Sequence, residues 1–136
     1  MNQTIEIKDG DELLARFIPE SEAWVKGLKF CSEDKEFIQV GIWGYEKGKE
    51  LKPHIHNKVT REVAFTQEVI FVKQGSIKAD IFNKKEKKIA EIVLTEGDLI
   101  ILISGGHGYK ILEDNTKVLE VKNGPYVGAE ADRRRI

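Results

Sequence analysis

The chain has 136 residues, of which 40% are apolar and 33% are charged, as in globular domains that bury a hydrophobic core. Its 22 basic and 23 acidic residues give a formal net charge of −1, so neither a nucleic acid nor a membrane is expected as a partner. No apolar run reaches the length of a membrane span. Cys31 is the single cysteine and excludes an internal disulfide, as is typical of a reducing compartment. We therefore expect one domain over residues 1–136 of a cytoplasmic protein.

The first residues predict a β-hairpin followed by a short helix. Apolar and polar residues alternate over 4–8, Asp9-Gly10 is a tight-turn signal, and residues 12–18 can pair back. Pro19 ends the second strand, and Ser21 is expected to cap a short helix that ends near Gly27.

From residue 37 onward the pattern is one of short strands separated by polar turns. The expected strands cover residues 37–45, 68–73, 76–82, 89–94, 99–103, 107–112 and 117–121. We expect 68–73 to pair with 76–82 across Gln74-Gly75, and the last two strands to pair with each other. Strands of this length and spacing predict an all-β sandwich or barrel.

Two of these strands are apolar on both faces. If Glu68 faces the interior, Ile70 and Val72 do so too, which leaves Val69 and Phe71 on the other face. Residues 99–103 are also apolar throughout. Such a surface requires a cover. The sequence therefore predicts that the N-terminal hairpin, a second subunit or both cover it, and that the protein is a homodimer.

The three histidines suggest a metal site. His54 and His56 are two residues apart, so in a strand they point to the same side, and His107 follows a later strand. Taken singly, each histidine is better explained as a surface or packing residue. Together with Glu68 they form a set of imidazoles and one carboxylate, which suits Fe, Mn, Ni or Zn better than Ca or Mg. We expect His54, His56, Glu68 and His107 to bind a divalent transition metal ion.

The spacing of these residues resembles the first motif of the cupin superfamily, G-x5-H-x-H-x(3,4)-E-x6-G. Gly48, His54 and His56 match its first half, and Glu68 and Gly75 match its second half. The departure lies between the halves, because eleven residues, 57–67, separate His56 from Glu68. Glu62 is the rival ligand, but position 69, where the motif glycine would fall, is a valine.

The second motif, G-x5-P-x-G-x2-H-x3-N, matches more loosely. Gly97, Gly105 and His107 are present, but the proline is missing, the histidine comes one residue early, and Ile111 replaces the asparagine. The resemblance implies a double-stranded β-helix, that is, a jelly-roll or cupin barrel. The barrel core would span about 37–122, with the N-terminal hairpin as a short extension.

Two further residues are candidates for substrate binding. Tyr109 points to the same side as His107 in a strand and can act as a proton donor, although a barrel-lining tyrosine bound to the backbone is an equal alternative. Arg61 lies in the insertion 57–67 and can hold a carboxylate or phosphate, although an exposed loop arginine is the commoner case. We expect this insertion to act as a lid or contact segment.

The resemblance leaves the function open between three classes. The chain is similar to short bacterial cupins that occur with polysaccharide-synthesis enzymes, an impression to which Gly124-Pro-Tyr-Val-Gly contributes. This implies a metal-binding protein that acts on or binds a small polar molecule, with a sugar derivative expected, in an isomerase- or epimerase-like reaction with the metal as Lewis acid. The alternatives are a non-haem iron oxygenase and a non-catalytic small-molecule-binding module.

Overall fold

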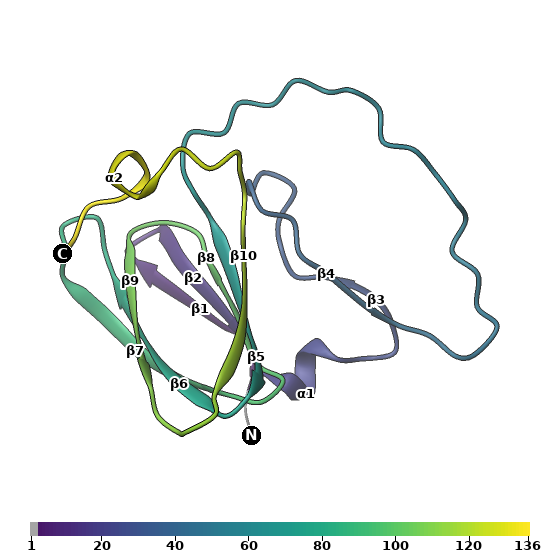
Figure 1. The fold of residues 1–136 in the computed structure, drawn as a ribbon, viewed down its shortest axis with the longest axis horizontal. Coiled ribbons are helices and arrows are strands. Elements are labelled where there is room, and N and C mark those ends of the chain that lie inside the picture. Colours follow the sequence, from purple (N-terminus) through teal and green to yellow (C-terminus); the bar gives the residue numbers. More distant parts are fainter. Residues whose placement is uncertain (1–2) are drawn as a thin grey trace.

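The computed structural model describes residues 3–136, which form an all-β structure of antiparallel sheets with two short helices (Figure 1). The strands are β1 (Ile5–Asp9), β2 (Glu12–Ile18), β3 (Gly27–Phe30), β4 (Gly41–Gly44), β5 (Glu68–Gln74), β6 (Ser76–Phe82), β7 (Lys88–Thr95), β8 (Leu99–Leu102), β9 (Gly106–Ile111) and β10 (Lys117–Lys122). The helices are α1 (Glu20–Ala23) and α2 (Ala129–Asp132). Within 3–136, neither helix is long or apolar enough to cross a membrane.

Two sheets pack face to face around the main core. The larger has the order β1-β2-β8-β5-β10 and the smaller the order β7-β6-β9; β3 and β4 form a separate ribbon. Within the described residues none of these sheets closes into a barrel. The core between the two sheets is almost entirely aliphatic. Its largest fully buried members are Leu14, Val72, Ile77, Ile81, Leu94 and Ile100.

The N-terminal hairpin is an integral part of the larger sheet. The predicted pairing of β1 with β2 is confirmed, but β2 also pairs with β8, so that Ala15 and Phe17 lie opposite Leu102 and Ile100. The register shifts between Ile7 and Lys8. The hairpin was expected as a short extension of the core, but it is part of the sandwich and supplies core residues.

The expected pairing of residues 68–73 with 76–82 was also wrong. β5 pairs with β8 and β10, whereas β6 pairs with β7 and β9. β5 is apolar on both faces and therefore suits the interior of the larger sheet. The chain crosses between sheets at Gly75, whose φ is +82° and where a Cβ atom would lie 2.2 Å from Thr116 Oγ1.

The last two strands are separated in the same way. β9 pairs with β6 and β10 pairs with β5, so residues 107–112 and 117–121 do not form the expected hairpin. The connection between β9 and β10 thus also crosses between the sheets, and hydrogen bonds join it to the crossing at Gly75. The backbone N–H of Leu112 donates to the carbonyl of Ser76 over 3.0 Å, and the N–H of Ser76 donates to Thr116 Oγ1 over 3.2 Å.

The outer face of the larger sheet is covered by the segment that follows the hairpin. Ala23, Cys31, Ile38 and Ile42 form a second core with the outward-facing residues of β2 and β8. The hairpin itself extends the sheet. The helix differs in detail from expectation, since α1 begins after Pro19 without a side-chain cap from Ser21. The expected strand 37–45 shortens to β4, which pairs with β3.

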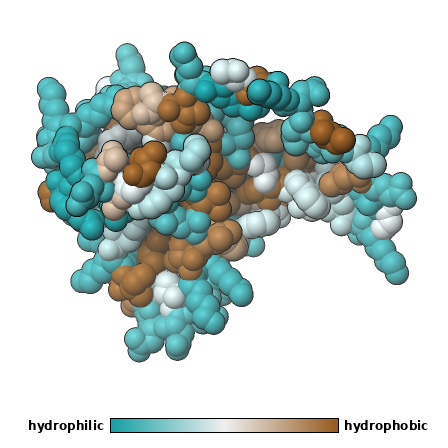
Figure 2. Space-filling model, turned by 45° about the horizontal axis from the view of Figure 1, so that its top comes forward, coloured by the Kyte–Doolittle hydropathy of each residue, from teal (hydrophilic) through white to brown (hydrophobic). Residues whose placement is uncertain are grey.

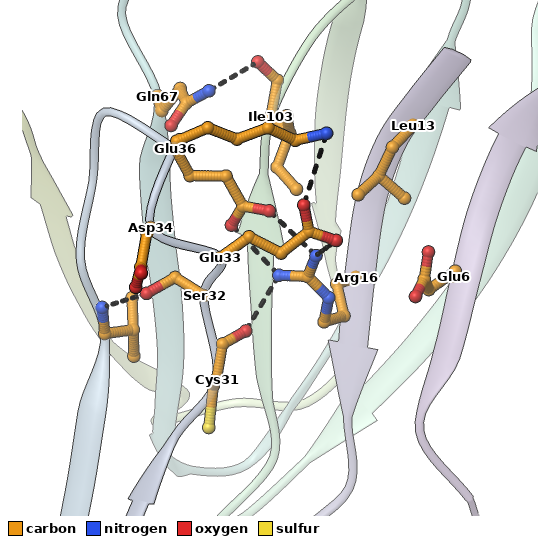
Figure 3. A network of polar contacts seen from close by, with 12 residues as sticks. Glu6, Leu13, Arg16, Cys31, Ser32, Glu33, Asp34, Glu36, Gln67 and Ile103 are labelled. Carbon is orange, nitrogen blue, oxygen red and sulfur yellow. Dashed lines mark hydrogen bonds and ion pairs between the residues drawn. The ribbon is translucent and has the colours of Figure 1, made fainter. Parts of the chain in front are cut away.

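A buried ion pair fastens this covering segment to the sheet (Figure 3). The Arg16 guanidinium donates to both carboxylate oxygens of Glu36, over 3.0 and 2.8 Å, and to the carbonyl of Cys31 over 2.7 Å. The hydrogen bond to Glu36 raises the pKa of Arg16 above its ordinary value, and burial raises that of the Cys31 thiol. Gln67 adds a second tie, because its side-chain oxygen accepts the N–H groups of Phe37 and Ile38.

The stretch between β4 and β5 projects from the body as a wide arc (Figure 1). Every residue from 43 to 66 is exposed, and residues 48–67 have no assigned helix or strand. The β3–β4 ribbon also leaves large side chains in solvent, since Leu28, Phe30 and Trp43 are more than half exposed. Figure 2 shows apolar surface gathered across the middle of the molecule.

Candidate functional site

A group of inward-facing polar residues lies on one side of the sandwich, between β9 and β10. Both strands are edges of their sheets, and in the described chain they do not pair with each other. His107 and Tyr109 lie opposite Ile81 and Ala79 of β6 and therefore face inward. We call this side the seam and define it by five inward-facing residues: Glu68, His107, Tyr109, Glu120 and Lys122.

The inward-facing residues along the seam remain in contact with solvent. Tyr109 is 38% exposed, Ile111 59% and Val118 38%, although each shares a face with fully buried residues of the neighbouring strand. In a closed sandwich these positions would be covered. The seam is thus a place where a ligand or a further segment of chain can reach the interior.

Glu68 is the centre of this group. Its side chain is 8% exposed, and Oε1 lies 3.3 Å from His107 Nε2. The Tyr109 hydroxyl donates to the same oxygen over 3.3 Å. Lys122 stands directly opposite on β10, with Nζ 3.9 Å from the second oxygen, Oε2. The inward position predicted for Glu68, Ile70 and Val72 is confirmed.

The surroundings of Glu68 favour its ionised form. Burial by itself raises the pKa of the carboxyl, but the hydrogen bond and charge of His107, with smaller contributions from Glu120 and Lys122, bring it below its ordinary value. For Tyr109, burial and the charge of Glu68 both raise the pKa of the phenol, so the hydroxyl keeps its proton and serves as a donor. The seam therefore holds an acceptor carboxylate beside a proton donor.

His54 and His56 lie elsewhere, on the projecting arc. Their rings are 4.9 Å apart, although the strand expected to align them is not formed, and His54 Nδ1 lies 3.3 Å from the carbonyl of Lys52. Within residues 3–136 no three His, Cys, Asp or Glu side chains form a group that could hold a metal ion. The structure thus joins Glu68 with His107 but does not join this pair with His54 and His56.

The remaining candidates divide in the same way. Tyr109 lies at the seam, whereas Arg61 and the rival ligand Glu62 are exposed on the arc. Sequence reasoning missed Glu120 and Lys122. The sequence shows that Glu120 and Lys122 share a face of the strand with Val118. Whether that face points inward depends on the pairing of β10 with β5, which the sequence does not show.

The arc is fastened beside the seam by Asn123. Its side-chain oxygen accepts the N–H of Gln67 over 2.7 Å, and its side-chain nitrogen donates to the carbonyl of Phe65 over 3.2 Å. Thr66 also donates to Asp132 of α2. These contacts fix the point at which the arc enters β5, one residue before Glu68.

Two shallow grooves lie on the outer surface, away from these side chains. The larger, of about 540 Å³, is lined by Trp24, Phe71, Lys73, Glu20, Glu96 and Gly97. Trp24 packs edge-on against Phe71 at 5.5 Å and donates from Nε1 to the carbonyl of Gly97. The smaller, of about 350 Å³, is lined by charged residues that include Arg16, Lys29 and Glu33, but Arg16 is already paired with Glu36. We take the seam as the candidate site because it joins Glu68 with His107 and Tyr109 at an edge that solvent reaches.

No family model, curated protein or solved structure matches this chain.

Proposed function

We propose that this protein binds a divalent transition metal ion through His54, His56, Glu68 and His107 and acts on a small polar molecule, with a sugar derivative as the expected substrate. The observation that carries the proposal is the contact of Glu68 with His107, 3.3 Å apart and drawn from different sheets. A buried carboxylate beside an imidazole at a solvent-accessible edge is half of a metal site of this type.

The free edge of β9 offers a route for the other half. The smaller sheet has the order β7-β6-β9, so a fourth strand can add beside β9. If residues 48–56 occupy that position, His54 and His56 point to one side of the sheet and can face His107. Residues 57–67 span up to about 36 Å when extended, which leaves ample chain to return to Glu68. This addition would complete a jelly roll of the cupin type.

The exposed side chains of the arc support this strand addition. Val59, Val63 and Phe65, in the segment that would connect the added strand to β5, are exposed. Burying such side chains against the seam would be favourable by about 25 cal/mol per Å² of apolar surface. The same movement would cover Tyr109 and Ile111 on β9.

The donor set suits Fe, Mn, Ni or Zn, because neutral imidazoles and one carboxylate match borderline ions. Such an ion, when bound, supplies Lewis acidity toward a carbonyl or hydroxyl oxygen and has open positions for it. In an isomerase- or epimerase-like reaction, Tyr109 holds a proton for the substrate at the seam. Arg61, carried inward with the arc, would bind a carboxylate or phosphate of the substrate.

The first experiment measures metal in the purified protein by elemental analysis. The double variant His54→Ala/His56→Ala should lose the metal, whereas the matched control Lys52→Ala/Lys58→Ala, on the same arc, should keep it. If the histidine variant retains stoichiometric metal, the proposed ligand set is wrong. The identity of the metal and an assay of oxygen consumption separate the isomerase from an iron oxygenase, and a ligand that co-purifies would name the substrate class.

A second experiment examines the strand addition. Adding metal to the metal-free protein should slow proteolysis and amide hydrogen exchange over residues 48–66. The His54→Ala/His56→Ala variant should show no such protection. Metal binding that leaves these residues as accessible as before would contradict the movement of the arc.

We also propose that the protein is a homodimer. The support is the face of the β3–β4 ribbon that carries Leu28, Phe30 and Trp43, each more than half exposed, since a large apolar patch commonly marks an association surface. Light scattering after size-exclusion chromatography should give twice the chain mass, and Phe30→Ser should shift the protein to monomer. A monomeric wild-type protein at high concentration would reject this part.

A further inference from the structure

The larger groove on the outer surface has no part in the metal site proposed above. It lies beside α1, β5 and the turn before β8, and Phe71 lines it from the face of β5 opposite to that of Glu68 (Figure 1). Its volume of about 540 Å³ falls within the range of small-molecule sites, about 300–1,000 Å³. We call it the Trp24 groove, and a ligand bound there does not touch the seam.

The indole ring of Trp24 is held in place on two sides of this groove. Nε1 donates to the carbonyl of Gly97 over 2.7 Å, and the ring packs edge-on against Phe71 with 5.5 Å between the ring centroids. The turn that carries Gly97 is itself held, because the N–H of Gly97 donates to the carbonyl of Val72 over 2.8 Å. Trp24 is nonetheless 50% exposed. The ring thus offers a fixed aromatic surface to solvent, while its one N–H donor is already used.

Three charged side chains, Glu20, Glu96 and Lys73, line the same groove. Within residues 3–136 none of these three charged groups forms an ion pair or a side-chain hydrogen bond. Glu20 is fixed at its backbone, since its N–H donates to Asp98 Oδ1 over 2.8 Å. Its stem lies close against Gly97, where an added Cβ atom would come within 2.3 Å of Glu20 Cγ. Two carboxylates and one ammonium leave the groove with a net negative charge.

The aromatic surface and the carboxylates together favour a cation. The face of an indole ring attracts a positive charge more strongly than the face of a tyrosine or phenylalanine ring. Two carboxylates beside the ring add to this attraction. Lys73 opposes it, but this exposed lysine has a flexible stem and can turn its ammonium group toward solvent. A neutral ligand would leave the negative charge of the groove unbalanced, and an anion would be repelled by it.

We propose that the Trp24 groove binds a small organic cation, with a methylated ammonium group on the face of Trp24 beside Glu20 and Glu96. A primary ammonium is compact and strongly hydrated, and a groove open to solvent does not replace its water. Methyl groups on the nitrogen weaken that hydration and add apolar contact with the rings of Trp24 and Phe71. The site does not depend on the seam or on a metal ion.

The test follows the fluorescence of Trp24 in the full-length variant Trp43→Phe, in which Trp24 is the single tryptophan. Choline and trimethyllysine represent a free compound and a modified side chain as sources of the cation. One or both should change the fluorescence saturably without added metal, and calorimetry with wild type should give the same affinity. The uncharged analogue of choline, in which carbon replaces the nitrogen, should bind about tenfold more weakly or less.

Variants of the groove separate the contributions of its parts. Glu20→Gln/Glu96→Gln should weaken choline binding by about 3- to 20-fold, whereas the matched control Glu130→Gln, on α2, should bind as wild type does. Lys73→Met should strengthen binding by about 2- to 5-fold, because a repelling charge is removed. Trp24→Leu, measured by calorimetry, should lose about 5-fold or more.

Four results would overturn the inference. They are the lack of a saturable response to either cation, equal binding of the uncharged analogue, tighter binding of glucose than of choline, and undiminished affinity in Glu20→Gln/Glu96→Gln. Circular dichroism checks that each variant is folded, and the two glutamines lie at exposed positions where they conserve shape. None of these readouts uses a metal ion, so failure of the proposed metal site would leave them unchanged.

Discussion

Two groups of charged residues in this molecule contain similar side chains but differ in how fully they are paired. In the first, Arg16 and Glu36 are 8% and 3% exposed, and two hydrogen bonds of 3.0 and 2.8 Å join them. In the second, around Glu68, the separations to His107 and Lys122 are 3.3 and 3.9 Å, and those two side chains are about one-third exposed.

The difference distinguishes a structural pair from a candidate site. Both carboxylate oxygens of Glu36 accept from a bidentate guanidinium, which also donates to the carbonyl of Cys31 (Figure 3). Because the Glu36 side chain is only 3% exposed, the carboxylate is closed to a ligand. At the seam, the longer contacts around Glu68 leave room for an ion to compete with them. A buried carboxylate held by short hydrogen bonds indicates a structural role. A carboxylate with longer contacts beside solvent can still accept a ligand.

The largest effect on stability is expected from breaking the saturated pair. Arg16→Met leaves the buried Glu36 carboxylate and the Cys31 carbonyl without a partner, which should lower the free energy of unfolding by about 3–5 kcal/mol, measured by urea denaturation. Metal content should stay the same if the protein remains folded.

Two controls make this prediction specific. Arg61→Met, on the exposed arc, should leave the free energy of unfolding within about 0.5 kcal/mol. The double variant Arg16→Met/Glu36→Met removes both charges and should recover most of the lost stability. A loss below about 1 kcal/mol in Arg16→Met would mean that this pair is no tighter than the group at the seam.

At the seam, a substitution should change stability little and metal affinity strongly. Glu68→Gln keeps the shape and can still accept from Tyr109, so its effect on unfolding should stay near 1 kcal/mol. Its metal affinity should fall at least about 10- to 100-fold, because a carboxylate ligand is lost. Glu62→Gln is the matched variant and should bind metal as wild type does. The reverse result would make Glu62 the ligand.

An intermediate effect is expected where the arc is fastened. Asn123→Ala removes the side-chain hydrogen bonds to Gln67 and Phe65 and should cost about 1–2 kcal/mol of stability. Faster proteolysis near residue 65 would accompany it. Asn57→Ala, on the exposed part of the arc, should change neither stability nor the rate of proteolysis. Equal behaviour of the two variants would show that the hydrogen bonds of Asn123 are dispensable.

The sequence predicted the all-β class, the position of most strands and the inward face of β5, because alternation and turn residues are local signals. It did not predict which strands pair. Gly75 reads as a hairpin turn in sequence, but it carries the chain from one sheet to the other. That choice depends on burial of both faces of β5, which is a property of the whole sandwich.

The same limit applies to the site. Glu68 and His107 were predicted as ligands of one metal ion from the resemblance in motif spacing, and the structure brings the two side chains within 3.3 Å of each other. Lys122 gave no signal in the sequence, since its position opposite Glu68 depends on the register between β10 and β5. Arg16 was likewise unnoticed, although an arginine between Leu14 and Ile18 in an apolar strand is an unusual residue that calls for a buried partner.

The smallest expected effect comes from Tyr109, because its substitution tests a single hydrogen bond to Glu68. Tyr109→Phe removes one donor to Glu68 Oε1, at 3.3 Å, and keeps the ring. Because a single hydrogen bond of this kind contributes about 0.5–1.5 kcal/mol, metal affinity should fall by only about 2- to 10-fold. Stability should change little, since the tyrosine is 38% exposed.

Turnover is expected to respond more strongly than metal affinity. If Tyr109 supplies a proton to the substrate, the phenylalanine variant keeps its metal and loses about 100-fold or more in rate, measured with whichever small polar molecule is found to bind to the metal-loaded protein. If rate and metal affinity fall together by the same small factor, Tyr109 only orients Glu68. In that case the group at the seam would resemble the Arg16–Glu36 pair, in which each contact holds a carboxylate in place.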